Sequence, residues 1–439
     1  MQKVFDVPSA NPITSASLPD AHFEFLTGFE GTHIFGSGWD VLETTEHTTR
    51  FPEDLERLAK DGLKSFRACI PWHRIEGEKG VYDWRWTDAY LTLARSLGLD
   101  PIADPLHHTS FPDWLAGGFA DPEFGPRYLA FLQAFARRYP QVTRYTIINE
   151  PFVTAWFCGH CAVWHPRQEG YEGFVPMLLA VSKTICEASA LLTELVPGAR
   201  FMHAESCERH SALDEESLAA AEHGNTMRFC VLDLILGRVD RDHPLHGLLA
   251  RFGMGERDVA WFKGHPARVD VLGLDYYSHS EIAWTKHGRA TTHPVAGFAS
   301  VALDYAERYR CPVMLSETNL RGTVADRIAW LRFMVEQSAT LQEKLKAIDL
   351  TFEGFCWYPY IDSTDWCSLV CDASRAIDPQ GIYWLDASFD RKPSELSEIY
   401  AALARGTMGP RDIPARPFED AVLDGRGVRN FLPLMGWAR

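Results

Sequence analysis

The chain has 439 residues, of which 46% are hydrophobic and 23% charged, and this ordinary globular composition excludes a disordered chain. Its net charge of −16 argues against nucleic-acid and membrane partners, because a phosphate-backbone binder needs a basic face and an anionic bilayer repels an acidic chain. No uninterrupted apolar run approaches the roughly 18 residues that span a bilayer.

Apolar strands alternate with amphipathic helices along most of the chain. The strands are predicted at residues 23–29, 64–70, 99–106, 142–149, 200–204, 268–277, 312–316 and 349–358. The helices between and after them are predicted at residues 52–62, 86–98, 123–139, 171–196, 215–237, 301–309, 323–344 and 393–404. The segment 52–62 illustrates the signals, since it has Pro near its start, acidic residues in its first turn and Gly at its end.

Eight strand–helix units in series predict an α/β protein built as a single (β/α)8 TIM barrel with elaborated βα loops. A doubly wound open sheet is the structural alternative, but residues 28–38 contain glycines without the GxGxxG phosphate turn that it would need. We expect one catalytic domain over residues 1–439. Residues 1–20 are expected to form an N-terminal extension, and residues 406–439, rich in Pro, Arg and Asp, an irregular C-terminal strap.

The first twenty residues lack the apolar core of a signal peptide, and the 10 Cys are scattered through the chain. We therefore expect a cytoplasmic protein without a disulfide framework. The chain is rich in aromatic residues, with 14 Trp. On composition alone they favour a large core over a cleft in which flat rings stack on sugars.

Two carboxylates stand at strand ends, where a TIM barrel carries its reactive groups. Glu150 ends the fourth predicted strand and Glu317 the seventh, and an ionised carboxylate after an apolar run is costly without a task or a partner. Either residue alone would be interpreted as a salt-bridged rim residue. Other strand ends add Arg67, His107, His108, Asn149, Glu205, Asp275, Tyr276, Tyr277 and Trp357. Together these residues predict a site.

Two facing carboxyls suit cleavage of a glycosidic bond, since one donates a proton to the leaving oxygen and the other attacks the anomeric carbon. Their surroundings must push the two pKa values apart. Arg67 is expected to keep Glu317 ionised, and the charge of Glu317 to raise the pKa of Glu150. Asp275 is a third acid close by, and we expect it to be neutral or paired with a base.

Several motifs occur in the order and at the strand ends of one known family. They are residues 66–75 (FRACIPWHRI), His108 with residues 111–112, residues 148–151 (INEP), residues 273–277 (GLDYY), residues 315–319 (LSETN), and residues 354–357 with 362–366. On these motifs the chain resembles the retaining β-glycosidases of glycoside hydrolase family 1, or a close relative in the same clan. The resemblance covers roughly residues 27–404.

The resemblance implies an exo-acting, β-glucosidase-like hydrolase that works by double displacement, with Glu317 as nucleophile and Glu150 as acid/base. It assigns the nucleophile contacts to Arg67 and Tyr277, and sugar contacts to His108, Asn149, Asp365, Trp366 and the platform Trp357, with Asp275 beside them. The retaining mechanism requires the two carboxyl groups to lie about 5–5.5 Å apart. The implied substrate is a small-molecule or oligosaccharide β-glycoside, with no cofactor and no metal. A homo-oligomer is left open.

Four positions depart from the family pattern, and most of them lie on the wall that binds the glycone. Gly28 stands where the family has a Gln, Thr109 where it has a Trp, Asp275 where it has an Asn, and Asp365 where it has a Glu. The reacting pair is intact. The departures leave open a modified glycone, an endo-glycosidase or transglycosidase of the same clan, and a non-catalytic sugar-binding barrel.

Two further patterns suggest metal or redox chemistry and are given little weight. Cys158 and Cys161 form a CxxC, but they follow the fourth strand without a thioredoxin-like context, so we interpret them as a cleft loop. His107 and His108 could belong to a metal hydrolase, which would need three converging ligands. Near the first strand, where such sites place a His-x-His pair, the chain has His33 alone.

Overall fold

The computed structural model describes residues 22–290 and 296–418, and it contains a closed barrel of eight parallel strands. The barrel strands are β1 (Glu24–Gly28), β4 (Ser65–Cys69), β5 (Asp100–Asp104), β6 (Arg144–Tyr145), β7 (Arg200–Ser206), β9 (Val271–Asp275), β12 (Val313–Glu317) and β13 (Phe352–Trp357). They are neighbours in chain order, and β13 pairs with β1 to close the ring. This confirms the predicted TIM barrel and rules out the open sheet.

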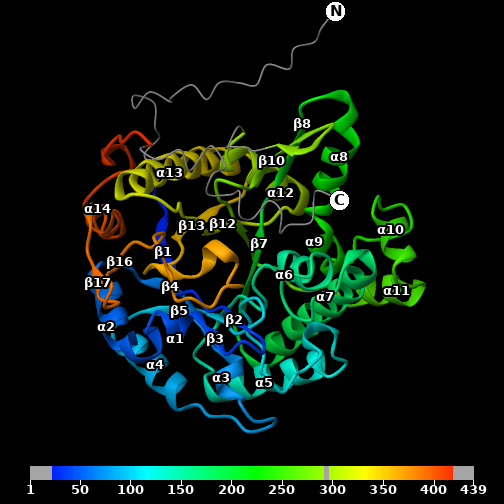
Figure 1. Cartoon of the computed structure of the whole chain (residues 1–439), viewed down its shortest axis with the longest axis horizontal. Helices are drawn as coiled ribbons and strands as arrows, with labels where there is room; N and C mark the ends of the chain where they lie inside the picture. Colours follow the sequence, from blue (N-terminus) through cyan, green and yellow to red (C-terminus); the bar gives the residue numbers. More distant parts are fainter. Residues whose placement is uncertain (1–21, 291–295, 419–439) are drawn as a thin grey trace, which may run out of the picture.

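Helices surround the strands in a ring (Figure 1). The main ones are α2 (His47–Lys60), α4 (Arg85–Ser96), α5 (Phe124–Arg138), α7 (Gly170–Leu195), α9 (Cys230–Ile235), α12 (Phe298–Tyr309), α13 (Val324–Lys346) and α14 (Glu395–Ala404). Shorter helices lie in the connections: α1 (Val41–Thr44), α3 (Trp72–Ile75), α6 (Pro151–Gly159), α8 (Leu218–Met227), α10 (His246–Arg251) and α11 (Glu256–Gly264). The predicted helices are therefore present, with most boundaries shifted by a few residues.

The βα loops carry small sheets of their own, as the prediction of elaborated loops requires. A three-stranded sheet contains β8 (Arg209–Ala212), β10 (Glu281–Thr285) and β11 (Gly288–Ala290). Three hairpin-like pairs are β2 (His33–Ile34) with β3 (Trp39–Asp40), β14 (Ser363–Thr364) with β15 (Ile377–Asp378), and β16 (Trp384–Leu385) with β17 (Arg391–Lys392). Residues 1–21 and 419–439 lie outside the described residues, so the predicted extension and most of the predicted strap do too.

Two predicted elements differ from the structure. The strand predicted at 142–149 is regular only over β6, because the chain then makes irregular hydrogen bonds to both neighbouring strands, ending with Asn149 N to Leu106 O (3.0 Å) and Glu150 N to Ala204 O (3.1 Å). The helix predicted at 215–237 is divided into a 3₁₀ turn, α8 and α9. The break falls at Arg228, whose guanidinium donates to the Glu208 carbonyl oxygen (2.7 Å).

The barrel has two packing layers, which the alternation of side chains along each strand separates. Inside the barrel lie Leu26, Ile102, Met202, Ala204, Val271, Met314, Cys356 and Tyr358. The other side of each strand packs against the helices in a larger cluster, which includes Phe355 and Trp357 of β13. The interior cluster fills the barrel, so the polar strand ends lie above a solid apolar floor.

Helix α7 is long and apolar enough to cross a membrane by length and composition, with a mean hydropathy of 1.5 in its most apolar 18-residue window. Polar residues such as Glu172 and Lys183 interrupt its apolar ones, so the helix holds no uninterrupted apolar run of that length. Its window is 67% buried inside the protein, and the helix packs beside α5 and α6. The apolar composition of α7 is therefore that of a core helix.

Pro52 lies inside α2, whereas the prediction placed it near the start of the helix. Proline cannot donate the hydrogen bond that the carbonyl of Thr48 would receive in a regular helix. The Trp86 indole donates to that oxygen instead (2.8 Å), so the structure satisfies the group that proline leaves free.

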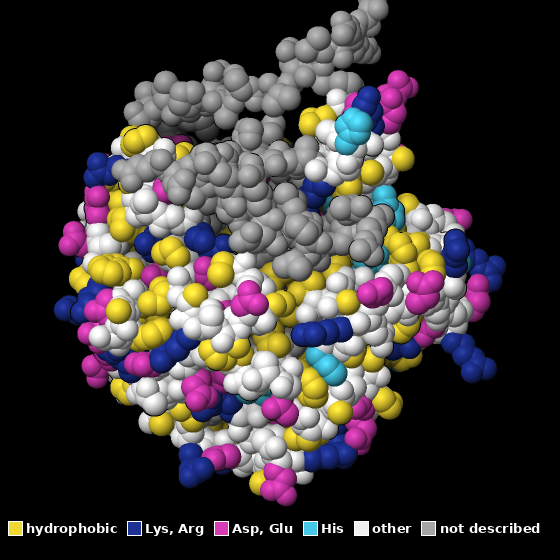
Figure 2. Space-filling view, viewed as in Figure 1, with side chains coloured by type: hydrophobic (Ala, Val, Ile, Leu, Met, Phe, Trp, Pro, Cys, Tyr) yellow, Lys and Arg dark blue, Asp and Glu magenta, His cyan; other side chains and the backbone are white. Residues whose placement is uncertain are grey.

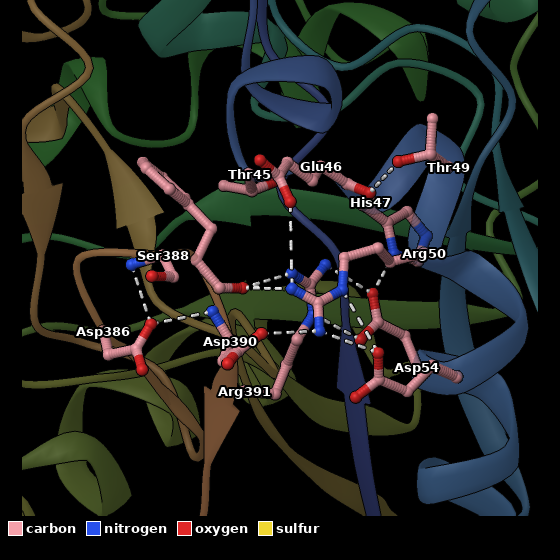
Figure 3. A network of polar contacts seen from close by, with 12 residues as sticks. Thr45, Glu46, His47, Thr49, Arg50, Asp54, Asp386, Ser388, Asp390 and Arg391 are labelled. Atoms are coloured by element: carbon pink, nitrogen blue, oxygen red, sulfur yellow. Dashed lines mark hydrogen bonds and ion pairs between the residues drawn. The ribbon is translucent and has the colours of Figure 1, made fainter.

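A buried ion pair ties the β16–β17 hairpin to α2 (Figure 3). Arg391 donates from Nε and Nη2 to the two oxygens of Asp54 (2.7 and 2.9 Å), and both side chains are fully buried. His47 Nδ1 bonds the same carboxylate (2.8 Å), while Arg50 holds the hairpin from outside through Asp390 and the Phe389 carbonyl oxygen. The β16–β17 hairpin is thus fixed to α2.

On the face shown in Figure 2, acidic and basic side chains are interspersed over the part of the surface that grey atoms do not cover. The chain's acidic excess is therefore spread on this face rather than gathered into one field.

We predict that Asp54→Asn lowers the free energy of unfolding by about 3–5 kcal/mol, because it leaves the Arg391 guanidinium buried without a charged partner. Urea unfolding measures the loss. Lys392→Met is the control, since Lys392 makes only partly exposed ion pairs with Asp386 and Asp390 and should cost less than about 1 kcal/mol. Equal losses in the two variants would contradict the interpretation.

Candidate active site

One cavity opens at the carboxyl ends of the barrel strands, and both predicted reacting carboxylates line it. Its walls include Glu30, His108, Glu150, Glu208, Tyr277, Glu317, Tyr358 and Trp366. These residues follow β1, β5, β6, β7, β9, β12 and β13. The barrel closure therefore brings together residues that are as far apart in the chain as Glu30 and Trp366.

Glu317 ends β12 and is held by two neighbours. Arg67 of β4 donates a short hydrogen bond from Nη1 to Glu317 Oε1, and Tyr277 donates from its hydroxyl to Oε2 (2.6 Å). Both contacts were expected from the sequence, and they leave the carboxylate oriented at the cavity wall. Burial and the nearby carboxylates raise the pKa of Tyr277 well above its usual range, so Tyr277 stays a donor.

Arg67 is almost completely buried and makes two further polar contacts. Its Nη2 donates to Asp104 Oδ2 (2.8 Å) and to Asn149 Oδ1 (2.6 Å). Burial alone would lower the pKa of Arg67, but Glu317 and Asp104 raise it well above the ordinary value. Arg67 is therefore a fixed positive charge between two carboxylates.

Glu150 follows β6 and directly precedes α6, whose first residue is Pro151. Its backbone has a left-handed φ of 41°, a sparsely populated conformation that costs on the order of 1–3 kcal/mol and turns the chain sharply from strand to helix. Burial and the charges of Glu317 and Glu205 raise the pKa of Glu150 well above its usual range. Glu150 thus keeps a proton beside a cavity that also contains Glu317.

Asp275 is fully buried at the end of β9. Its Oδ1 accepts from the Ser316 hydroxyl (2.6 Å), and its Oδ2 has no hydrogen-bond partner among the described residues. Burial, followed by the charges of Glu317 and Glu150, raises the pKa of Asp275 well above its ordinary value. This agrees with the neutral state that the sequence predicts as one of two alternatives.

Sequence reasoning missed Glu30, which follows β1 and lines the cavity. Glu30 Oε1 lies 3.2 Å from His107 Nε2, and His107 Nδ1 lies 2.8 Å from Asp104 Oδ2. Burial alone would lower the pKa of His107, but the two carboxylates raise it to about 10. The same strand-end rule that identified Glu150 could have identified Glu30, since a Glu follows the apolar run FEFLTGF directly.

The structure corrects the prediction that Trp357 forms a sugar platform. Trp357 is fully buried in the helix-facing layer, where its indole donates to the Gln380 carbonyl oxygen (2.9 Å). Side chains alternate along β13, so the next residue, Tyr358, faces the barrel interior and lines the cavity. The prediction was wrong by one residue, which in a strand means the opposite face.

Asp365 is also corrected, because it does not line the cavity. Its carboxylate accepts from the Ser374 hydroxyl (2.6 Å) and from the backbone N–H groups of Arg375 and Ala376 (2.9 and 3.0 Å), so it folds its own loop. Trp366 does line the cavity, as predicted, with its ring 5.6 Å from that of His108.

His108 lines the cavity, but Asn149 lies behind its wall. His108 Nε2 is 3.7 Å from Glu150 Oε2, so this ring adjoins the predicted acid/base. Asn149 is fully buried, its oxygen accepts from Arg67, and its Nδ2 lies 3.5 Å from His107 Nε2. The predicted sugar contact of Asn149 is therefore not visible in this arrangement.

Cys158 and Cys161 lie at the end of α6 and just after it as free thiols, and Cys158 is completely buried. Within residues 22–290 and 296–418, no group of three or more His, Cys, Asp or Glu side chains is placed to hold a metal ion. The absence of a metal requirement stays a prediction.

Comparison with solved structures gives the fold family. A family 1 β-glucosidase from Thermotoga maritima superposes with a TM-score of 0.73 over 87% of this chain and 97% of that one, at 16% identity. The same organism's β-glucosidase in complex with noeuromycin gives a TM-score of 0.74 at 17% identity, with the same coverage. The chain has the β-glucosidase-like fold of family 1 glycoside hydrolases.

Curated relatives share more identity with the chain but cover less of it, and no family model matches the chain. A glycosyl hydrolase-like protein 1 from Saponaria officinalis is 29% identical over 32% of this chain and 33% of its own length. Thermostable β-glucosidase B of Thermobispora bispora is 26% identical over 56% and 55%. The aryl-phospho-β-D-glucosidase BglC of Bacillus subtilis is 22% identical over 78% and 83%. The chain thus spans a third to about half of the first two relatives.

We predict that Asp275→Asn makes folding less sensitive to pH. The raised pKa means that folded Asp275 keeps a proton which the unfolded chain loses above about pH 4, so this group weakens folding as the pH rises toward the folded-state pKa. Between about pH 4 and the folded-state pKa, the free energy of unfolding of the variant should rise relative to that of the natural chain by up to roughly 1.4 kcal/mol per pH unit.

Urea unfolding at several pH values between 5 and 8 tests this expectation. Asp372→Asn, the same change at an exposed position, is the matched control and should leave the pH slope unchanged. Parallel slopes for the natural chain and Asp275→Asn would contradict a protonated Asp275.

Proposed function

We propose that this protein is a retaining β-glycosidase that removes a terminal sugar from β-glycosides, and that it is β-glucosidase-like in its substrate. The observation that carries the proposal is a single cavity lined by two carboxyls with different surroundings. Arg67 and Tyr277 hold Glu317 as an acceptor, while burial and neighbouring charge raise the pKa of Glu150. Family 1 β-glucosidases with the same fold support this assignment.

In the first step, Glu317 attacks the anomeric carbon and the bond to the leaving oxygen breaks. Glu150 gives its proton to that oxygen, so the aglycone leaves as an alcohol and a covalent glycosyl–Glu317 ester forms. The Tyr277 hydroxyl and Arg67 orient the attacking carboxylate. Electrostatic stabilisation of the charge that develops on the sugar comes from the cavity's carboxylates.

In the second step, water attacks the anomeric carbon from the side that the aglycone has left. Glu150, now ionised, takes a proton from this water, and the ester bond to Glu317 breaks. Glu317 returns as a carboxylate and Glu150 regains its proton. Two inversions give a sugar product with the configuration of the substrate.

The residues that line the cavity favour a substrate whose sugar carries no phosphate group. In the described part of the chain Arg321 is the single Arg or Lys that lines the cavity, and its Nε lies 2.9 Å from Asp378 Oδ1. A sugar phosphate needs cations, whereas Tyr358 and Trp366 offer rings on which an uncharged sugar stacks. We also propose a cytoplasmic location, in keeping with the ten free thiols.

We predict that Glu317→Gly nearly abolishes hydrolysis of aryl β-glucosides, because the covalent step loses its nucleophile. Added azide should then replace the carboxylate and give the α-glycosyl azide. Product analysis by NMR checks the anomer. If the natural chain hydrolyses no aryl β-glycoside but binds sugars, the protein is a sugar-binding protein. If it transfers the sugar to an alcohol faster than to water, it is a transglycosidase.

We predict that Glu150→Gln slows release of basic leaving groups by roughly 10²–10⁴-fold and acidic ones such as dinitrophenolate much less, because only the former need a proton. In the natural chain kcat/KM should fall as the pH rises through the Glu150 pKa, and this basic limb should disappear in the variant. The measurement is kcat/KM against pH for aryl β-glucosides of graded leaving-group acidity. Equal losses for all leaving groups would rule out the acid role.

A further inference from the structure

Glu30 lines the cavity at a point where sequence reasoning placed no charged group. Only 7% of its surface is exposed. Its Oε1 accepts from Thr32 N (3.0 Å) and Thr32 Oγ1 (2.7 Å), and it lies 3.2 Å from His107 Nε2 in an ion pair. Its Oε2 accepts from none of the residues that the structure describes. One oxygen is therefore fixed by the protein, and the other is left for a ligand in the cavity.

Glu30 lines the same cavity as His108 and Trp366. The His108 ring lies 5.6 Å from the Trp366 ring, and burial lowers the pKa of His108 well below its ordinary value. His107 holds the pKa of Glu30 at about 2 against the effect of burial. A buried carboxylate that stays ionised needs a donor, and a sugar hydroxyl supplies one.

Glu30 also begins a chain of alternating charges that ends at the predicted nucleophile. His107 lies between Glu30 and Asp104. Asp104 Oδ2 is hydrogen-bonded to both His107 Nδ1 (2.8 Å) and Arg67 Nη2 (2.8 Å). Arg67 reaches Glu317 through its other terminal nitrogen. Interactions between such groups are strong in a buried environment, so a change at one end alters the other.

We propose that Glu30 determines substrate specificity by accepting a hydrogen bond from one glycone hydroxyl, and that His107 and Asp104 are positioning residues that couple this contact to the Arg67–Glu317 pair. The inference rests on the proposed glycosidase function. The substrate class is a glycone that is uncharged and has a free hydroxyl at this wall. A carboxylate or phosphate group there would be repelled by Glu30.

The test compares aryl β-glucosides that each lack one hydroxyl, using the natural chain and Glu30→Gln. One of these deoxy substrates lacks the hydroxyl that donates to Glu30. For that substrate the natural chain should lose about 10–100-fold in kcat/KM relative to the full glucoside, and Glu30→Gln should lose clearly less. Glu43→Gln is the matched control, because Glu43 is 67% exposed and paired with Arg74 outside the cavity. It should reproduce the natural pattern.

The coupling is tested with Asp104→Asn alone and combined with Glu30→Gln. Asp104→Asn should lower kcat more than it raises KM, and the double variant should lose less than the product of the two single losses, as residues in one network do. Thermal unfolding of each variant identifies any loss that comes from misfolding. Multiplicative losses would overturn the coupling.

The outcomes separate the inference from the function on which it rests. A natural chain that hydrolyses none of the glucosides would refute the proposed function. An active natural chain whose penalties for every missing hydroxyl are the same in Glu30→Gln would refute the contact of Glu30 with the sugar and leave the glycosidase assignment standing.

Discussion

The buried contact between Arg67 and Glu317 is the interaction on which the rest of the site depends. A carboxylate at the end of a barrel strand, almost out of contact with water, is stable only beside a fixed positive charge. The single charge of Arg67 already balances the two carboxylates of Glu317 and Asp104, so it does not stabilise further ionised carboxyls nearby. Glu150 and Asp275 therefore keep their protons. The difference between the surroundings of Glu317 and those of Glu150 and Asp275 follows from this shortage of positive charge.

The barrel and the meeting of Glu150 and Glu317 in one cavity could be predicted from the sequence because both depend on local and repetitive signals. Strand–helix alternation gives the fold, and parallel closure brings every strand's carboxyl end to one side. The rest of the site depends on single-residue register, which composition does not reveal. Trp357 and Tyr358 are adjacent aromatics at a strand end, and only the pleat decides that the second one faces the cavity. Asp365 looked like a sugar ligand, yet its hydrogen bonds fold its own loop.

The cavity is costly for the stability of the fold. It combines a left-handed glutamate, several buried carboxyls and an arginine with few contacts to water. The remaining barrel offsets this with an apolar interior below the site and a double layer of aromatic and aliphatic contacts around it. The buried Asp54–Arg391 pair fixes the segment after β13 to α2, far from the reacting groups. One sparsely populated backbone conformation, that of Glu150, lies at a strand end beside Glu317.

One departure from the family pattern, Gly28, is linked in space to Tyr358 and Glu30. A side chain at Gly28 would begin 2.6 Å from the Tyr358 ring and 2.9 Å from Arg67 Cβ, so the ring can occupy its place only if this residue is glycine. The Tyr358 ring in turn lies 5.0 Å from the Arg67 guanidinium and 5.6 Å from the His107 ring, and its hydroxyl donates to the Phe29 carbonyl oxygen. That bond fixes the backbone one residue before Glu30. Gly28, Tyr358 and Glu30 are therefore linked in space, because the glycine makes room for the ring and the hydroxyl of that ring fixes the backbone next to Glu30.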